Sequence, residues 1–165
     1  MKKGLNKQDL LKLIESLKIS KDEFTILPSS ALVLRGIYES AGDLDIAVTQ
    51  TGLSELKRNY NLILKENNWY KLNYEVECIL DDMVGKKEKF DEYFLQDIYD
   101  YLAYLETSNR EKDKQRIIIV KEYIKTRKYN KWVLILSWYL HSGDKIVKTN
   151  VKYRKISKKM LYYCK

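Results

Sequence analysis

The chain has 165 residues, of which 45% are hydrophobic and 33% are charged, and its formal net charge is +8. This length and balance are typical of one globular domain with a sizeable core, and they exclude an intrinsically disordered chain. No apolar run approaches the ~20 residues of a membrane span, and the N-terminus lacks the unbroken apolar segment of a signal peptide. The two cysteines are too few for a disulfide framework. We therefore expect a cytoplasmic protein that does not contact a membrane.

Hydrophobic periodicity and turn residues predict the elements in chain order. A helix capped by Asn6 is expected over residues 6–18, then a short buried strand over 24–27 and, after Pro28, a helix over 29–37. Next come a strand over 43–49, a helix over 52–66, strands over 69–72 and 74–80, and an irregular stretch over 81–92. Helices follow over 95–106, from a capping box at Ser108 to about residue 125, and over 132–141. This order predicts an α+β fold, in which a small mixed sheet has flanking helices and the C-terminal half is helical.

The positive charge is concentrated at one end of the chain. Eight of the 31 lysines and arginines lie between residues 145 and 165, where there is no acid, so the rest of the chain has 23 bases and 23 acids. Tyrosines are interleaved with the tail bases. Such a segment could contact the phosphates of a nucleic acid and stack on its bases, and it could equally be a solvated tail that improves solubility.

The residues that suggest chemistry are Asp43 and Asp45, two acids one residue apart within an apolar strand. Alternate residues of a strand share a face, so the two carboxylates repel each other unless a cation lies between them. An isolated pair of this kind also occurs as a turn or a cap. The run YEVECIL adds Glu75 and Glu77, either of which could be a third carboxylate. Three carboxylates suit Mg²⁺, which takes part in phosphoryl transfer.

A pair of serines, Ser29 and Ser30, stands between the strand over 24–27 and the following helix. The free N–H groups at the start of a helix, together with serine hydroxyls, can receive phosphate oxygens. The order of a serine pair, two aspartates and a third carboxylate therefore suits a nucleoside triphosphate with Mg²⁺.

The run SALVLRGIYESAGDLDI, residues 30–46, resembles without a gap part of the nucleotidyltransferase superfamily with the DNA polymerase beta-like fold. The likeness is to small stand-alone bacterial and phage nucleotidyltransferase-like proteins. A second likeness lies in SNREKDKQRI, residues 108–117, because members often carry an Asn-Arg-x-Lys-Asp stretch at the start of a late helix. The resemblance implies a nucleotidyltransferase-like domain over residues 1–127, and residues 128–165 would extend it with a helix and the basic tail.

This resemblance implies a Mg²⁺-dependent enzyme that moves a nucleoside monophosphate from a triphosphate to an acceptor hydroxyl and releases pyrophosphate. The acceptor would be a nucleic acid such as tRNA, or a protein. Asp43 and Asp45 would bind two metal ions together with Glu77, preferred to Glu75, which would also orient or deprotonate the acceptor. The expected nucleotide-binding residues are Ser29, Ser30, Arg35, Arg110 and Lys112. For the last two, an exposed helix cap with ion pairs is the other interpretation.

The sequence departs from the family pattern at the turn and just after it. Pro28 and Ser29 stand where members have glycine, and Tyr38 stands where many have a basic residue. Glycine lets a backbone approach a phosphate closely, whereas proline removes an N–H donor. The departures lead to a second hypothesis, a catalytically degenerate scaffold that binds nucleic acid or, like some nucleotidyltransferase-like antitoxins, a toxin.

Overall fold

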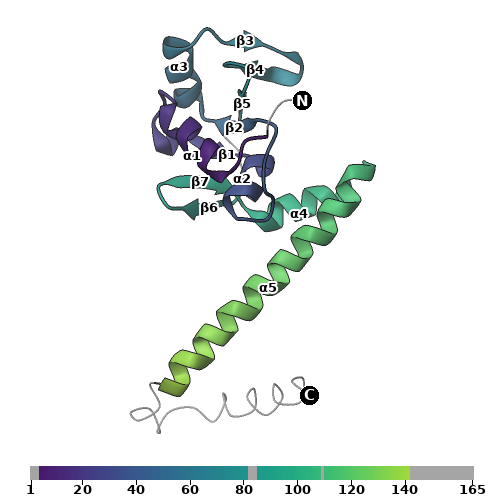
Figure 1. The fold of residues 1–165 in the computed structure, drawn as a ribbon. Coiled ribbons are helices and arrows are strands. Elements are labelled where there is room, and N and C mark those ends of the chain that lie inside the picture. The colour runs from purple at the N-terminus through teal and green to yellow at the C-terminus, as the bar shows by residue number, and fades with distance from the viewer. Residues whose placement is uncertain (1–3, 82–84, 109, 142–165) are drawn as a thin grey trace. The chain divides into compact units, whose positions relative to one another are not determined.

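The computed structural model describes residues 4–81, 85–108 and 110–141 (Figure 1). The chain divides into two compact units, Met1–Tyr123 and Ile124–Lys165, and the helix α5 (Glu111–His141) crosses the boundary between them. The basic segment 145–165 lies outside the described residues. Within the described part, no helix has the length and apolar character that a membrane crossing requires.

Of the four described helices that lie wholly in the first unit, three begin at a side-chain cap, and the one that starts at Pro28 has none. The four helices are α1 (Lys7–Ser16), α2 (Pro28–Leu34), α3 (Gln50–Asn59) and α4 (Ile98–Thr107), with short 3₁₀ turns at Lys21–Glu23 and Glu66–Asn68. The Asn6 side chain accepts hydrogen bonds from the backbone at the start of α1, as predicted. Thr49 caps α3 and Asp97 caps α4 in the same way. These side chains satisfy N–H groups that have no partner within a helix, so they fix where each of these three helices begins.

Within the described residues, seven strands form one mixed sheet. They are β1 (Phe24–Ile26), β2 (Leu44–Val48), β3 (Ile63–Leu64), β4 (Trp69–Lys71), β5 (Val76–Leu80), β6 (Lys87–Phe90) and β7 (Tyr93–Gln96). Their order is β3-β4-β5-β2-β1-β7-β6, with β3 and β6 at opposite ends (Figure 1). Strand β2 is antiparallel to β1 and parallel to β5, and β1 is parallel to β7. The predicted α+β fold, a mixed sheet with flanking helices, is confirmed.

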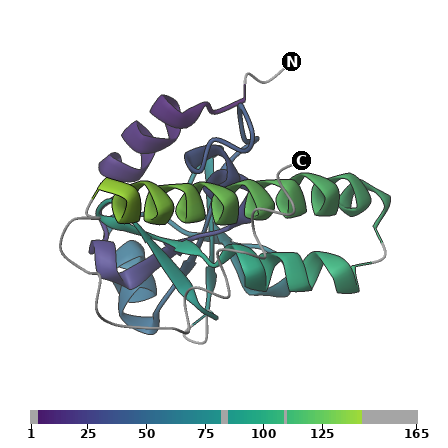
Figure 2. The same cartoon turned by 90° about the horizontal axis from the view of Figure 1, so that it is seen from below.

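The core joins α1, α2 and α3 to the central strands. Its largest fully buried side chains include Leu10, Leu34, Ile46, Leu56 and Leu95. Each such side chain stabilises the fold by about 1.5–3 kcal/mol relative to an exposed position. At the far end of the unit, α4 and the first turns of α5 lie side by side (Figure 2) and are joined by a 2.7 Å ion pair between Lys121 and Glu106. The central strands that carry the acids are therefore anchored on a closely packed core.

Several local predictions are wrong. The helix predicted over 52–66 ends at Asn59, because residues 63–64 pair with β4 as an edge strand. Residues 87–96, expected to be irregular and then helical, form the hairpin β6–β7, which turns at Asp91 with a φ of 50°. Its outer strand is mostly charged, as suits a sheet edge, and so lacks an apolar strand pattern. The helix predicted to start at 132 is instead a continuation of α5. The helix predicted over 29–37 ends at Leu34.

Candidate active site

The acidic residues meet where β2 runs parallel to β5. The register of these strands places Asp45 beside Glu77. Asp43 precedes β2 by one residue and therefore shares a face with Asp45. All three carboxylates line an open cleft of about 590 Å³, together with Lys65, Glu66, Asn67 and Trp69. The structure thus gathers the three predicted acids from two strands into one cleft, and it is Glu77 rather than Glu75 that lines it.

The turn between β1 and α2 is bonded to the backbone of both aspartates. The backbone N–H of Leu27 donates to the carbonyl oxygen of Asp45 at 2.9 Å. The hydroxyl of Ser30 donates to the carbonyl oxygen of Asp43 at 2.8 Å. On the other side, the N–H of Leu44 donates to the carbonyl of Glu75 at 2.7 Å. These three hydrogen bonds therefore fix the backbone from Asp43 to Asp45.

The surroundings of Asp45 raise the free energy needed to ionise its carboxyl group. The pKa of Asp45 is raised from 3.8 to about 6, first because the carboxylate is half-buried and then because Asp43 and Glu77 repel its charge. The nearby ammonium of Lys65 acts in the opposite direction. A bound cation would offset this repulsion and favour the ionised form of Asp45. The cleft therefore has the electrostatics of a cation-binding site.

Lys65 already supplies one positive charge to this cleft. Its ammonium lies 2.7 Å from each of the two carboxylate oxygens of Glu77. The side chains of Lys65 and Glu77 are 45% and 21% exposed, respectively. The hydrogen bond to Glu77 raises the pKa of Lys65, with smaller contributions from the two aspartates. The contact is thus an ion pair at the solvent-facing side of the cleft.

The turn that carries Lys65 has a defined backbone. Lys65 follows β3, and its N–H donates to the carbonyl of Trp69 at 2.7 Å, which closes the loop to β4. Asn67 and Asn68 adopt the left-handed conformation, with φ values of 57° and 61°. Asparagine tolerates this conformation better than most residues do. Both the charge of Lys65 and the indole of Trp69 are therefore held at the cleft.

The donor set fits a hard divalent cation in its chemistry. Three carboxylates from two adjacent strands are suitable ligands for Mg²⁺, which keeps several waters and adds substrate phosphates. Within residues 4–81, 85–108 and 110–141, however, no three acidic, histidine or cysteine side chains converge closely enough to hold an ion as they stand. Glu77 is directed at Lys65 instead. Asp43, Asp45 and Glu77 therefore suit a Mg²⁺ ion once the Glu77 carboxylate releases Lys65 and turns to the ion.

The predicted phosphate-binding serines have different surroundings. Ser30 is fully buried, and its hydroxyl is engaged with the Asp43 carbonyl. The hydroxyl of Ser29 is also buried, but it has no hydrogen-bond partner in the described part of the chain. A buried hydroxyl without a partner is costly, and a bound water or ligand oxygen would satisfy it. Neither serine lines the cleft, and of the two hydroxyls only that of Ser29 lacks a hydrogen-bond partner among the described residues.

Arg35 does not line the cleft. Its guanidinium lies 2.9 Å from the carboxylate of Glu88 and donates to the carbonyl of Gln96 at 2.7 Å. Its side chain is only 4% exposed. Arg35 therefore links α2 to the hairpin β6–β7, at the side of the sheet away from β4 and β5.

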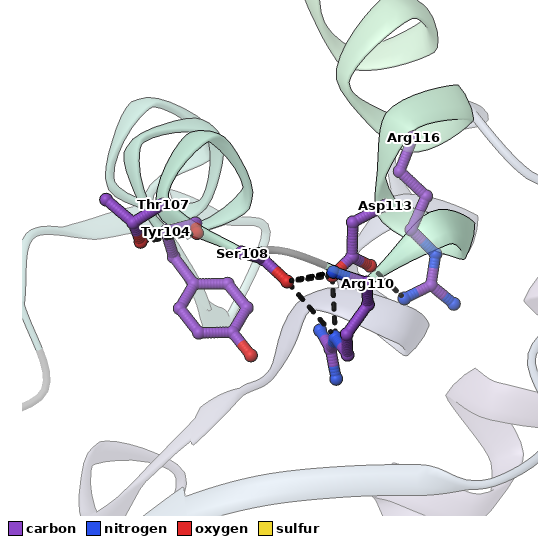
Figure 3. Close-up of polar contacts among 6 residues, drawn as sticks. All are labelled: Tyr104, Thr107, Ser108, Arg110, Asp113 and Arg116. Atoms are coloured by element: carbon purple, nitrogen blue, oxygen red, sulfur yellow. Dashed lines mark hydrogen bonds and ion pairs between the residues drawn. The ribbon is translucent and has the colours of Figure 1, made fainter.

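Arg110 and Lys112 lie at the start of α5, and neither lines the cleft. Figure 3 shows Arg110 directed at the buried carboxylate of Asp113, 2.6 Å away, which also accepts a 2.5 Å hydrogen bond from Ser108. The Ser108 hydroxyl, and then Arg110, lower the pKa of Asp113. Arg116 approaches the other carboxylate oxygen at 3.4 Å. In this structure Ser108, Arg110 and Asp113 join the end of α4 to the start of α5.

Sequence reasoning missed four residues of the cleft, which are Lys65, Glu66, Asn67 and Trp69. The helix predicted over 52–66 assigned Lys65 to its last turn. The consecutive residues Asn67 and Asn68 were the available signal, because paired asparagines favour a turn rather than a helix. A turn there would have placed Lys65 and Trp69 at the two ends of a hairpin, next to Glu77.

Comparison with known proteins adds no assignment. No model of a protein family matches this sequence, and no curated protein matches it significantly.

Proposed function

We propose that this protein is a Mg²⁺-dependent nucleotidyltransferase that acts in the cytoplasm. The observation that carries the proposal is the parallel register that sets Asp45 beside Glu77, with Asp43 on the same face. The strand, turn and helix at residues 24–34 are bonded to the backbone of both aspartates. This arrangement supports the resemblance to the nucleotidyltransferase superfamily, which has the same succession of elements.

In the proposed reaction, the oxygen of an acceptor hydroxyl attacks the α-phosphorus of a nucleoside triphosphate. The bond between the α-phosphorus and the oxygen that bridges to the β-phosphate breaks, and pyrophosphate leaves. Asp43, Asp45 and Glu77 would hold Mg²⁺, which when bound supplies the positive charge that offsets the triphosphate. Glu77 orients the acceptor hydroxyl and accepts its proton.

The remainder of the cleft suits a nucleotide. The whole cleft has a volume of about 590 Å³, which lies within the range of small-molecule sites. Trp69 offers an aromatic face on which a base can stack, a contact that tolerates any base. For the acceptor we propose a nucleic acid such as tRNA, bound through the basic segment 145–165.

The test is transfer of label. The full-length protein is incubated with each α-labelled nucleoside triphosphate, Mg²⁺ and total cellular RNA and protein. We expect label on one acceptor class with the wild type, none with the Asp43→Asn/Asp45→Asn variant, and undiminished transfer with Glu75→Gln. The last variant is the matched control, because it removes a nearby carboxylate that does not line the cleft. Equal labelling by the wild type and the double variant would refute the assignment.

A second candidate is a degenerate scaffold that binds nucleic acid without catalysis. The observations that favour it are the Ser30 hydroxyl engaged with a backbone carbonyl and the Glu77 carboxylate engaged with Lys65. This candidate predicts salt-sensitive RNA binding that deletion of residues 145–165 abolishes, with no label transferred under any condition.

A further inference from the structure

The ion pair between Lys65 and Glu77 involves one of the three residues on which the proposed metal site depends. Both carboxylate oxygens of Glu77 are within 2.7 Å of the Lys65 ammonium. A carboxylate bonded in this way has poor access to a metal ion. The ammonium and the ion would therefore compete for the same two oxygens.

Lys65 is free to leave without disturbing the fold. Its backbone is fixed by the hydrogen bond to Trp69, but its charged group stands at the end of a four-carbon chain that is 45% exposed. Partly exposed ion pairs contribute little stability, so the contact opens at small cost. The exchange thus requires only a side-chain rotation and no movement of β3 or β4.

A released ammonium would remain at the mouth of the cleft, which Lys65 lines. Without substrate, that position faces three carboxylates. When a metal ion neutralises them and a triphosphate enters, the same ammonium faces a strongly anionic ligand. A lysine that serves as a counter-ion to the empty cleft can therefore become a phosphate ligand in the occupied one.

We propose that Lys65 is an exchangeable counter-ion, which occupies Glu77 in the free protein, yields it to a divalent metal ion, and then binds the phosphates of the nucleotide. The proposal rests on the proposed function, and it adds a binding order to it. Metal alone binds weakly because it must displace Lys65. Metal and triphosphate together bind more tightly than either does alone, because the displaced ammonium gains a new partner.

The test is a calorimetric titration of the full chain with Mg²⁺ alone, and then with a non-hydrolysable triphosphate at saturating Mg²⁺. In Lys65→Met we expect Mg²⁺ alone to bind about three- to tenfold more tightly and the triphosphate to bind at least tenfold more weakly. Lys65→Arg keeps the charge and should retain the weak metal binding of the wild type. Lys71→Met is the matched control, because Lys71 stands opposite Glu77 in the register of β4 and β5 but does not line the cleft.

The outcomes are distinct. Opposite changes in metal and triphosphate affinity in Lys65→Met, absent from Lys71→Met, would support the exchange. Unchanged or weaker Mg²⁺ binding in Lys65→Met would overturn it, while the metal site itself would stand. The same changes in both variants would also overturn it, because they would show a general effect of net charge. If neither the wild type nor Lys65→Met bound Mg²⁺, both the exchange and the proposed enzyme would be refuted.

Discussion

The replacement of Asp45 by asparagine should stabilise the metal-free protein. Asparagine has almost the same shape as aspartate but no charge, so the substitution removes first the cost of burying the Asp45 charge and then its repulsion by Asp43 and Glu77, while it keeps the packing. The pKa of Asp45 is raised from 3.8 to about 6, which corresponds to ~3 kcal/mol at full effect. Because Asp45 is only half-buried, water screens part of this unfavourable free energy. We therefore expect Asp45→Asn to raise the free energy of unfolding by about 1–2 kcal/mol at pH 7.5.

The direction of the pH dependence follows from linkage. The folded protein holds the Asp45 proton more tightly than the unfolded chain, because the pKa is higher in the fold. Below about pH 3.8, Asp45 is protonated in both states and does not affect the free energy of unfolding of the wild type. As the pH rises towards 6, that free energy falls, and above pH 6 the loss is complete. The asparagine variant does not titrate at this position. The difference in stability between the two proteins should grow between about pH 4 and 7 and then stay constant.

The assay is urea denaturation followed by circular dichroism at several pH values between 4.5 and 7.5, with Glu75→Gln as control. Taking the difference between variants removes the titration of all other groups. We also expect 10 mM Mg²⁺ to stabilise the wild type and not Asp45→Asn, because only the wild type keeps all three carboxylates. An Asp45→Asn variant that is less stable than the wild type at pH 7.5, or a difference independent of pH, would refute the reasoning.

Three further predictions concern the surrounding fold. Gly52→Ala should lower the free energy of unfolding by about 1–2 kcal/mol in the same urea assay, because its Cβ would lie 2.7 Å from the Glu23 carbonyl oxygen, whereas Gly42→Ala, with open space around it, should be neutral. Ser30→Ala should cost about 1–3 kcal/mol, since it leaves the partly buried carbonyl of Asp43 without this donor, and it should reduce label transfer by displacing the first aspartate. Burial raises the pKa of the Cys78 thiol to about 12, so with the other cysteine replaced by serine the native protein should not react with a thiol reagent at pH 8 until urea unfolds it.

The acidic part of the site could be predicted because it depends on local rules. Alternation along a strand places Asp43 and Asp45 on one face whatever the rest of the chain does. The preference for Glu77 over Glu75 came from its place within an apolar run, and the register of β2 and β5 sets Glu77 beside Asp45. The helix start at Asn6 was visible for the same reason, because capping needs only neighbours in sequence.

The basic part of the site could not be predicted, because it depends on partners far apart in sequence. Arg35 was expected at the phosphates, but Glu88 and the carbonyl of Gln96 hold it on the hairpin β6–β7, more than fifty residues away in the chain. Lys65 was hidden in a helix pattern that the pairing of β3 with β4 overrides. Lysine and arginine carry their charges at the ends of long side chains, so only the tertiary fold decides which acid each of them pairs with.

This asymmetry between acids and bases bears on how the site would work. The carboxylates are set on central strands and backed by the core, so they cannot move apart to relieve their repulsion. The cation opposite them stands on a short edge hairpin, at the end of a flexible and partly exposed side chain. A rigid array of negative charge and a mobile positive charge together favour exchange, in which whichever cation is present occupies the cleft. A site built only for stability would pair fixed acids with fixed bases, as Arg35 is paired with Glu88 on the other side of the sheet.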